Sequence, residues 1–157
     1  MSGEGAPVLS TVDAKGLLLG VVATRWYDEL TTQMLDRALA AAAACGVDDV
    51  VAIRVAGSVE LPVVAQALAG RCDAVVALGV VIRGETAHFD YVCRSVTDGL
   101  TRVALDAQTP VAHGVLTVDT IEQAWARAGF ADSPEDKGWG ATVAALDAAL
   151  AIRAVSA

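Results

Sequence analysis

Hydrophobic residues follow two alternating patterns along the chain: short continuous apolar runs, and longer segments in which apolar residues recur every three or four positions. A continuous run is typical of a strand buried on both faces of a parallel sheet. The three-to-four spacing indicates a helix with one apolar face. The pattern predicts strands at 17–23, 50–56, 74–82 and 111–116. It predicts helices at 29–45, 61–69, 89–107, 121–128 and from Ser133 to about Val155.

Residues with strong capping preferences mark several of the predicted helix ends. Asp28 stands where the N-cap of the first helix is expected, and Gly46 where that helix should end. Ser133, followed by Pro134 and two acidic residues, predicts the start of the last helix. Gly138 is expected to weaken the first turns of this helix.

Strands that alternate with helices imply right-handed crossovers and a parallel sheet covered on both faces. The predicted fold class is therefore α/β, a three-layer αβα sandwich with a four-stranded parallel sheet. We expect one domain over residues 1–157, with residues 1–15 as an N-terminal arm. Ligands of such sheets bind outside the carboxyl ends of the strands. The candidate site loops are 24–28, 57–60 and 83–88.

Composition narrows the function classes. Hydrophobic residues make up 55% of the 157 residues and charged residues 19%, which excludes intrinsic disorder. No charge-free apolar run approaches the roughly 20 residues of a membrane span, and we expect residues 1–16 not to be a secretory signal. The net charge of −8 argues against nucleic acid as a partner. Three widely spaced cysteines suit a reducing, cytoplasmic environment.

The apolar residues are small, because the chain has only seven aromatic residues (three Trp, two Tyr and two Phe) and many alanines. This much apolar surface exceeds what one small core requires. We therefore expect an oligomer with a large buried interface.

The third candidate loop carries the residues most suited to an anion. Gly84 and Thr86 follow a strand and precede a helix, where backbone N–H groups and the helix dipole attract phosphate. His88 opens that helix and can move protons near neutral pH. The spacing alone slightly favours a plainer role for His88 as a surface or capping residue.

The other two loops are more ambiguous. Ser58 and Glu60 can hydrogen-bond a polyhydroxylated ligand, yet a helix cap and a first-turn acid explain them more simply. Trp26, after the first strand, can either stack on a flat heterocycle or anchor the first helix.

Three further residues are candidates from outside these loops. Arg127 and Lys137 can bind an anion, although Arg127 also suits a helix C-terminus. His113 lies within the fourth predicted strand, where histidine is more often packed than catalytic. No His, Cys or acidic set has metal-ligand spacing, so no metal site is predicted.

One long block of sequence is specific enough to suggest a family. The segment ALGVVIRGETAHFDYVCRSVTDGL (Ala77–Leu100) resembles the core motif of the lumazine synthases of riboflavin biosynthesis. Three further segments resemble the family in the same order: AGSVELP (Ala56–Pro62), TPVAHGVLTVDTIEQAWARAG (Thr109–Gly129) and EDKGWGATVAAL (Glu135–Leu146). The resemblance implies a flavodoxin-like arrangement of the sandwich.

The resemblance also implies a reaction. The family condenses 5-amino-6-(D-ribitylamino)uracil with 3,4-dihydroxy-2-butanone 4-phosphate to 6,7-dimethyl-8-ribityllumazine, releasing phosphate and water, without metal or redox cofactor. His88 would be the catalytic proton shuttle. The other residues implied in the site bind substrate: Trp26, Ser58, Val59, Glu60, Val80, Val81, Ile82, Gly84, Glu85, Thr86, His113, Arg127 and Lys137.

Within that set the resemblance assigns parts of the two substrates. Trp26 and the backbone of 80–82 would contact the pyrimidine, 58–60 the ribityl chain, and 84–86 with Arg127 the phosphate. Family members commonly have Phe or Asn where this chain has His113, so pyrimidine binding is expected to depend on pH. Glu85 is expected to turn its side chain away from the anion.

Assembly follows from the same resemblance. The implied unit is a homopentamer with sites between subunits, where His113, Arg127 and Lys137 come from the neighbouring chain, and riboflavin synthase is an implied partner. The connection 129–138 is longer than the family's shell-forming turn, acidic, and contains Pro134. We therefore expect an isolated pentamer rather than a sixty-subunit shell. The rival interpretations are a non-catalytic flavin- or lumazine-binding protein and a purely structural assembly protein.

Overall fold

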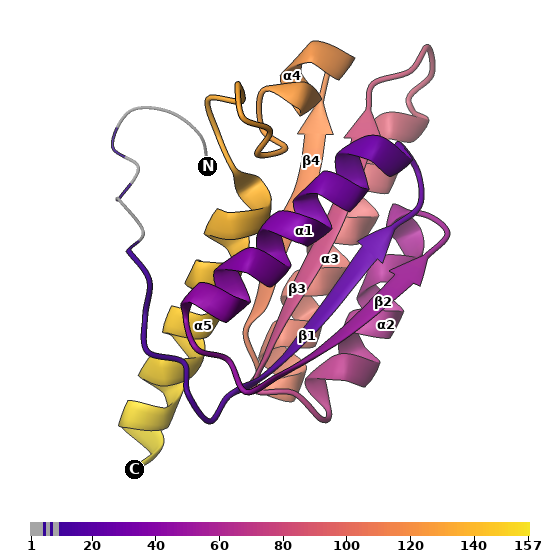
Figure 1. The fold of residues 1–157 in the computed structure, drawn as a ribbon. Coiled ribbons are helices and arrows are strands. Elements are labelled where there is room, and N and C mark those ends of the chain that lie inside the picture. Colours follow the sequence, from indigo (N-terminus) through magenta and orange to yellow (C-terminus); the bar gives the residue numbers. More distant parts are fainter. Residues whose placement is uncertain (1–4, 6, 8–9) are drawn as a thin grey trace.

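The computed structural model describes residues 5, 7 and 10–157, and shows the predicted alternation of strands and helices (Figure 1). The strands are β1 (Leu18–Thr24), β2 (Asp49–Val55), β3 (Ala74–Ile82) and β4 (Val111–Val118). The helices are α1 (Asp28–Ala44), α2 (Leu61–Ala69), α3 (His88–Ala107), α4 (Ile121–Trp125) and α5 (Lys137–Ser156). A 3₁₀ turn, η1 (Ser58–Glu60), precedes α2.

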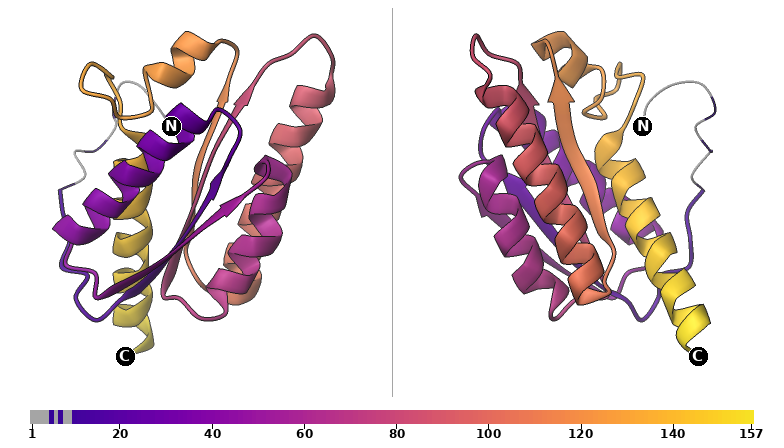
Figure 2. Two further views of the ribbon diagram at one scale, coloured as in Figure 1. Left: turned by 45° about the vertical axis from the view of Figure 1, so that its right-hand side comes forward. Right: turned by 180° about the vertical axis from the view of Figure 1, so that it is seen from behind.

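The four strands form one parallel sheet in the order β2-β1-β3-β4. The chain leaves β1 toward β2 on one side and then returns past β1 to β3 on the other. Helices α1 and α5 cover one face, and α2 and α3 cover the other (Figure 2). This confirms the predicted α/β three-layer sandwich with flavodoxin-like topology. The strand order changes direction between β1 and β3, which is where ligands of such sheets bind.

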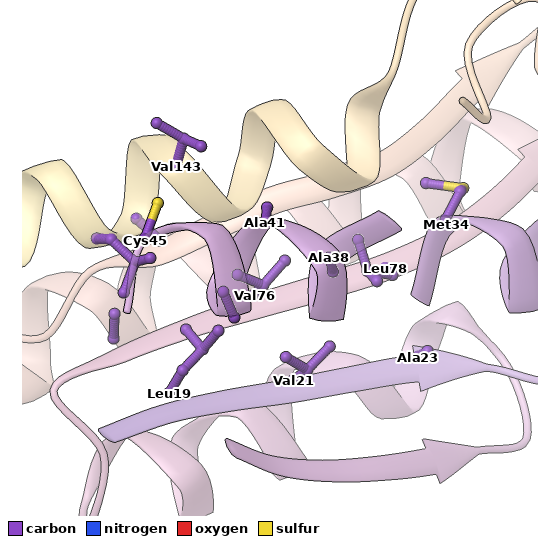
Figure 3. Close-up of a cluster of buried hydrophobic side chains, with 14 of the residues drawn as sticks. Leu19, Val21, Ala23, Met34, Ala38, Ala41, Cys45, Val76, Leu78 and Val143 are labelled. Carbon is purple, nitrogen blue, oxygen red and sulfur yellow. The ribbon is translucent and has the colours of Figure 1, made fainter. Parts of the chain in front are cut away.

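Alternate residues of the central strands supply two separate cores. Leu19, Val21 and Ala23 of β1 pack in the cluster beneath α1 and α5 (Figure 3). Val22 of β1 and Val75 of β3 belong to the cluster beneath α2 and α3. Because neighbouring residues of a strand point to opposite faces, both faces of a buried strand must be apolar. The continuous apolar runs in the sequence are the direct result.

The start of α1 differs from the prediction. Asp28 is the first helical residue rather than the N-cap, which is Tyr27 in the left-handed conformation with φ 53°. The Asp28 carboxylate instead accepts a hydrogen bond from Arg54 Nη2 at 2.9 Å. A tertiary ion pair with β2 has therefore displaced the local capping bond that the sequence pattern favours.

The predicted N-cap of the last helix, Ser133, lies three residues before the observed one. Helix α5 begins at Lys137, and its N-cap is Asp136, whose carboxylate accepts the N–H of Trp139 at 3.0 Å. The Ser133 hydroxyl donates to the carbonyl of Trp125 at 2.6 Å and so closes the preceding loop. Helix α4 also ends earlier than predicted, at Trp125.

Gly138 has a packing role that the prediction missed. A Cβ atom built on Gly138 would collide with the backbone carbonyl oxygen of Met34 on α1. The absence of a side chain lets the first turn of α5 lie directly against α1. Gly138 is thus a contact residue between two helices and more than a weak point in one of them.

By length and composition, α5 is long and apolar enough to cross a membrane. The lengths of the charge-free apolar runs in the sequence predicted no membrane span. It has this character because Lys137, Asp147 and Arg153 are its only charged residues. In this structure α5 packs against α1, β3 and β4. In this structure 33% of its most apolar 18-residue stretch is buried, so packing on the sheet accounts for part of its apolar composition.

The predicted N-terminal arm is described only in part, since residues 1–4, 6 and 8–9 lie outside the described residues. Its last residues are anchored to the core. Ala14 is fully buried, and its N–H donates to the carbonyl of Cys45 at 2.8 Å. The chain therefore enters β1 from a fixed position beside the end of α1.

Candidate functional site

Three loops meet at the carboxyl edge of the sheet, beside the point where the strand order changes direction. They follow β1 (residues 25–27), β2 (56–60) and β3 (83–87). Figure 1 shows all three at the arrowhead end of the strands, together with the start of α3. The candidate residues of the predicted site loops are thus brought together, as expected for a parallel sheet.

The loop after β2 is built around a glutamate cap. Glu60 Oε2 accepts the N–H of Gly57 at 2.8 Å, which closes the η1 turn before α2. Ser58 is buried, and a Cβ atom on Gly79 of β3 would lie only 3.0 Å from its hydroxyl oxygen. Gly79 therefore lets the Ser58 loop approach β3 closely. The expected helix cap at Ser58 is wrong, because Gly57 is the N-cap of η1 and Glu60 that of α2. Glu60 is an acid in the first turn of η1, as expected, and Val59 beside it is exposed.

The loop after β1 presents an exposed tryptophan. The Trp26 side chain is 64% exposed, so it does not anchor α1 in the core. Its indole lies close to the second loop, because a Cβ atom on Gly57 would be 3.5 Å from Trp26 Nε1. Arg54 braces the base of this loop by donating from Nη2 to the carbonyl of Thr24 at 2.7 Å. The indole is therefore exposed at an open edge, next to Gly57 at the start of the loop after β2.

The loop after β3 has the features of an anion site. Val80 is buried, Val81 and Ile82 are half-buried, and Gly84, Glu85 and Thr86 are exposed. The Thr86 hydroxyl accepts the N–H of His88 at 3.3 Å, at the first turn of the 20-residue helix α3. The exposed N-terminus of a helix attracts negative charge. His88 itself is exposed beside this loop.

Arg127 and Lys137 form a charged cluster around one carboxylate. Lys137 Nζ lies 2.7 Å from Glu135 Oε2, and Arg127 Nε lies 3.8 Å from Glu135 Oε1. Arg127 Nη1 also donates to the carbonyl of Gln123 at 2.9 Å, which fixes the guanidinium on α4. The two predicted anion-binding cations are thus neighbours. Glu135 is a member of this cluster that the sequence reasoning missed, although it lies in the quoted EDKGWG segment.

His113 lies apart from the other candidates within one chain. It stands five residues before the end of β4, which is about 16 Å along a strand. Its Nε2 is 3.0 Å from the hydroxyl oxygen of Thr97 on α3. Desolvation lowers the pKa of the His113 imidazole, although its side chain is partly open to solvent in the isolated chain. The backbone carbonyl of His113 opposes this effect only in part.

Sulfur and metal chemistry find no support in the part of the chain that the structure describes. All three cysteines are free, and burial raises the pKa of the Cys72 and Cys93 thiols, which disfavours reactive thiolates. The described residues contain no group of three or more His, Cys, Asp or Glu placed to hold a metal ion.

Fold and site together define a doubly wound α/β protein with a candidate small-molecule site at the switch point of its sheet. Comparison with known proteins makes this specific. The family model for 6,7-dimethyl-8-ribityllumazine synthase matches residues 16–153. The chain therefore belongs to the lumazine synthase family.

Individual relatives agree with the family match. The chain is 72% identical to the 6,7-dimethyl-8-ribityllumazine synthase of Salinispora arenicola, over 99% of this chain and 94% of that protein. It is 65% identical to that of Thermobifida fusca, over 98% and 89% of the two chains. It is 62% identical to that of Saccharopolyspora erythraea, over 98% and 93%.

Proposed function

We propose that this protein is a lumazine synthase that condenses 5-amino-6-(D-ribitylamino)uracil with 3,4-dihydroxy-2-butanone 4-phosphate to 6,7-dimethyl-8-ribityllumazine. The observation that carries this proposal is the family match over 16–153, which includes every candidate site residue. The site geometry supports it, since an exposed indole, a buried hydroxyl and a helix N-terminus stand at one sheet edge.

The pyrimidine substrate is assigned to the loops after β1 and β2. The exposed Trp26 indole is available to stack on the heterocycle, and stacking of this kind needs an open ring face. The backbone of Val80, Val81 and Ile82 would contact the ring edge, while Ser58, Val59 and Glu60 would line the ribityl chain. Glu60 Oε2 already accepts the Gly57 N–H, which would hold the carboxylate in place for sugar hydroxyls.

The phosphate of the second substrate is assigned to the loop after β3. Gly84, Glu85 and Thr86 precede α3, so their backbone N–H groups lie where the helix dipole favours an anion. Arg127, with Lys137 nearby, would supply the positive charge from a neighbouring subunit.

The chemistry requires proton movement on two reactive partners. The amine attacks the ketone to give a carbinolamine, which loses water to form an imine. Phosphate then leaves, and the resulting enol tautomerises to a ketone. The second amine attacks this carbonyl and loses a second water, which closes the ring. His88, exposed beside the phosphate loop, is assigned the proton transfers. Because both substrates are intrinsically reactive, we expect their positioning to contribute more to the rate than His88 does.

We infer that the working unit is a cytoplasmic homopentamer with sites between subunits. The distance of His113 from the loop cluster along β4 supports a contribution from a second chain. Exposed apolar side chains of Tyr91, Leu105 and Val155 supply surface for such contacts. Riboflavin synthase, which would consume the lumazine product, is the proposed partner.

The deciding experiment mixes the purified protein with both substrates and follows the fluorescence of the lumazine product above the uncatalysed rate. Saturable acceleration is the expected result, and His88→Ala should slow turnover while leaving measurable activity. Tight lumazine binding without acceleration would instead identify a binding protein on the same scaffold. In the same preparation, a particle of about 80 kDa supports the pentamer, whereas a particle of about 1 MDa indicates a sixty-subunit shell.

A further inference from the structure

Arg83 belongs to the family-like block but has no part in the site described above. It is the first residue after β3, and its backbone N–H donates to the carbonyl of Val118 at the end of β4 at 2.9 Å. Its position is therefore fixed by the sheet. The loop that carries Gly84, Glu85 and Thr86 begins directly at this fixed point.

The Arg83 side chain reaches across to the other end of the same loop. Its Nη1 donates to Asp90 Oδ1 at 3.3 Å, and its guanidinium carbon lies 4.2 Å from the ring centroid of Phe89. Both partners belong to the first turn of α3, next to His88. One side chain thus spans the loop from its beginning at β3 to its end at α3.

A third contact joins this bridge to β4 and α4. Arg83 Nε donates to Asp119 Oδ1 at 2.7 Å, the shortest contact of the group. Asp119 is itself held, because its backbone N–H donates to Gln123 Oε1 at 2.8 Å. The hydrogen bond that Arg83 donates to Asp119 raises the pKa of the Arg83 guanidinium. Asp119 is therefore fixed by two contacts, its carboxylate by Arg83 and its backbone by Gln123.

The positive charge of Arg83 has a second effect on this loop. Asp90 and Asp119 place two carboxylates beside the helix N-terminus, where they would repel a phosphate. The planar guanidinium of Arg83 contacts both, which a lysine ammonium is poorly shaped to do.

We propose that Arg83 is a positioning residue for phosphate binding, which holds the loop 84–87 and the start of α3 in register and offsets one of the two negative charges of Asp90 and Asp119 beside them. This inference rests on the proposed function, since it concerns the same phosphate loop. Arg83 does not touch the phosphate in this assignment; it acts through the loop and the two carboxylates.

The contacts are exposed, and exposed ion pairs contribute little to folding stability. We therefore expect Arg83 to affect ligand binding more than the free energy of unfolding. Arg102 offers a matched control, because it pairs with Asp106 at 3.0 Å on the same helix, far from the loop. Removing either arginine deletes one exposed positive charge, together with two ion pairs at Arg83 and one at Arg102.

The test titrates inorganic phosphate into the full-length assembly and follows the backbone amide signals of Gly84 and Thr86 by NMR. Arg83→Gln should weaken phosphate binding about tenfold, while Arg102→Gln should leave it unchanged. Arg83→Lys should recover only part of the affinity, because it restores the charge without the fork. Adding Asp119→Asn to Arg83→Gln should also recover part, because one unneutralised carboxylate is removed.

Steady-state kinetics supply the second readout. Arg83→Gln should raise the KM for butanone phosphate about tenfold while the pyrimidine KM changes less than twofold. Wild-type phosphate affinity in Arg83→Gln, or complete recovery in Arg83→Lys, would overturn the positioning role. If the wild-type protein does not catalyse the condensation, the proposed function fails, and the phosphate titration still decides the role of Arg83.

Discussion

Two charged clusters at the carboxyl edge of the sheet have opposite compositions. In one, Arg83 lies between the carboxylates of Asp90 and Asp119. In the other, the carboxylate of Glu135 lies between Arg127 and Lys137. The first cluster has a formal charge of −1 and the second of +1. The side chains of the first are 47–63% exposed, and those of the second 28–29%.

This difference matches the two proposed roles, positioning for Arg83 and phosphate binding for Arg127. The positive cluster attracts a phosphate dianion, and partial burial reduces the screening of that attraction by salt. The negative, exposed cluster repels an anion, and it does so less while its arginine offsets one of the two carboxylate charges. The carboxylate of Glu135 lies between the two cations and reduces their mutual repulsion. The same residue types would therefore serve two purposes, which their arrangement distinguishes.

The largest expected effect comes from removing the binding cation. Arg127→Ala should raise the KM for butanone phosphate about a hundredfold, since an anion loses a charged hydrogen-bond partner. The pyrimidine KM should change much less, and steady-state kinetics with each substrate varied in turn measures both. Arg94→Ala is the control, because Arg94 is an exposed arginine of α3 paired with Asp98. Equal effects on the two substrates would contradict the assignment.

The next largest effect is expected at Gly138, which follows Lys137 of the positive cluster in the first turn of α5. Gly138→Ala should destabilise the protein by about 2 kcal/mol, because the new methyl group forces α5 away from the Met34 carbonyl. Urea unfolding measures this, and phosphate affinity should fall with it since Lys137 moves. Gly70→Ala is the matched control, as its Cβ would meet only ordinary contacts. Equal midpoints for the two variants would show that α5 shifts without cost.

The fold could be predicted from the sequence to a large extent, because a buried parallel strand leaves an unmistakable apolar run. Strand β3 and helix α2 have the predicted bounds, 74–82 and 61–69. The predicted caps Asp28 and Ser133 are wrong. The Asp28 carboxylate pairs with Arg54, 26 residues away, and the Ser133 hydroxyl donates to the Trp125 carbonyl within the preceding loop. Local patterns cannot report a partner that is distant in sequence.

The candidate site, like the fold, could be predicted from the sequence only in part. The loop residues around Trp26, Ser58 and His88 follow from the strand ends and the family-like motif, and their meeting follows from the parallel sheet. The proposed role of Arg83 and the charge of the Glu135 cluster depend on ion pairs that form only in the folded chain. The residues stand in the quoted segments, but the sequence does not show which of them pair.

Removing the carboxylate of the positive cluster is expected to strengthen phosphate binding, an effect that is smaller than those above and opposite in sign. Glu135→Gln should bind inorganic phosphate about threefold more tightly at low salt, because the cluster charge rises from +1 to +2. The gain should shrink as salt is added. Glu122→Gln removes the same charge from an exposed position on α4 and should change little. Weaker phosphate binding in Glu135→Gln would instead show that the carboxylate orients Arg127.

The smallest effect is expected at His113, outside both clusters. Desolvation lowers its pKa in the folded protein below the ordinary value of 6.5, so the unfolded chain binds a proton more readily. Stability contributed by the neutral ring is present above about pH 6.5 and is lost as the pH falls below it. The urea midpoint of the wild type should therefore drop more between pH 7.5 and 5.5 than that of His113→Gln, which carries no titrating ring. Because other groups titrate equally in both proteins, the difference isolates His113. Parallel curves would mean that the Thr97 hydroxyl, 3.0 Å from Nε2, accommodates the charged ring as readily as water does.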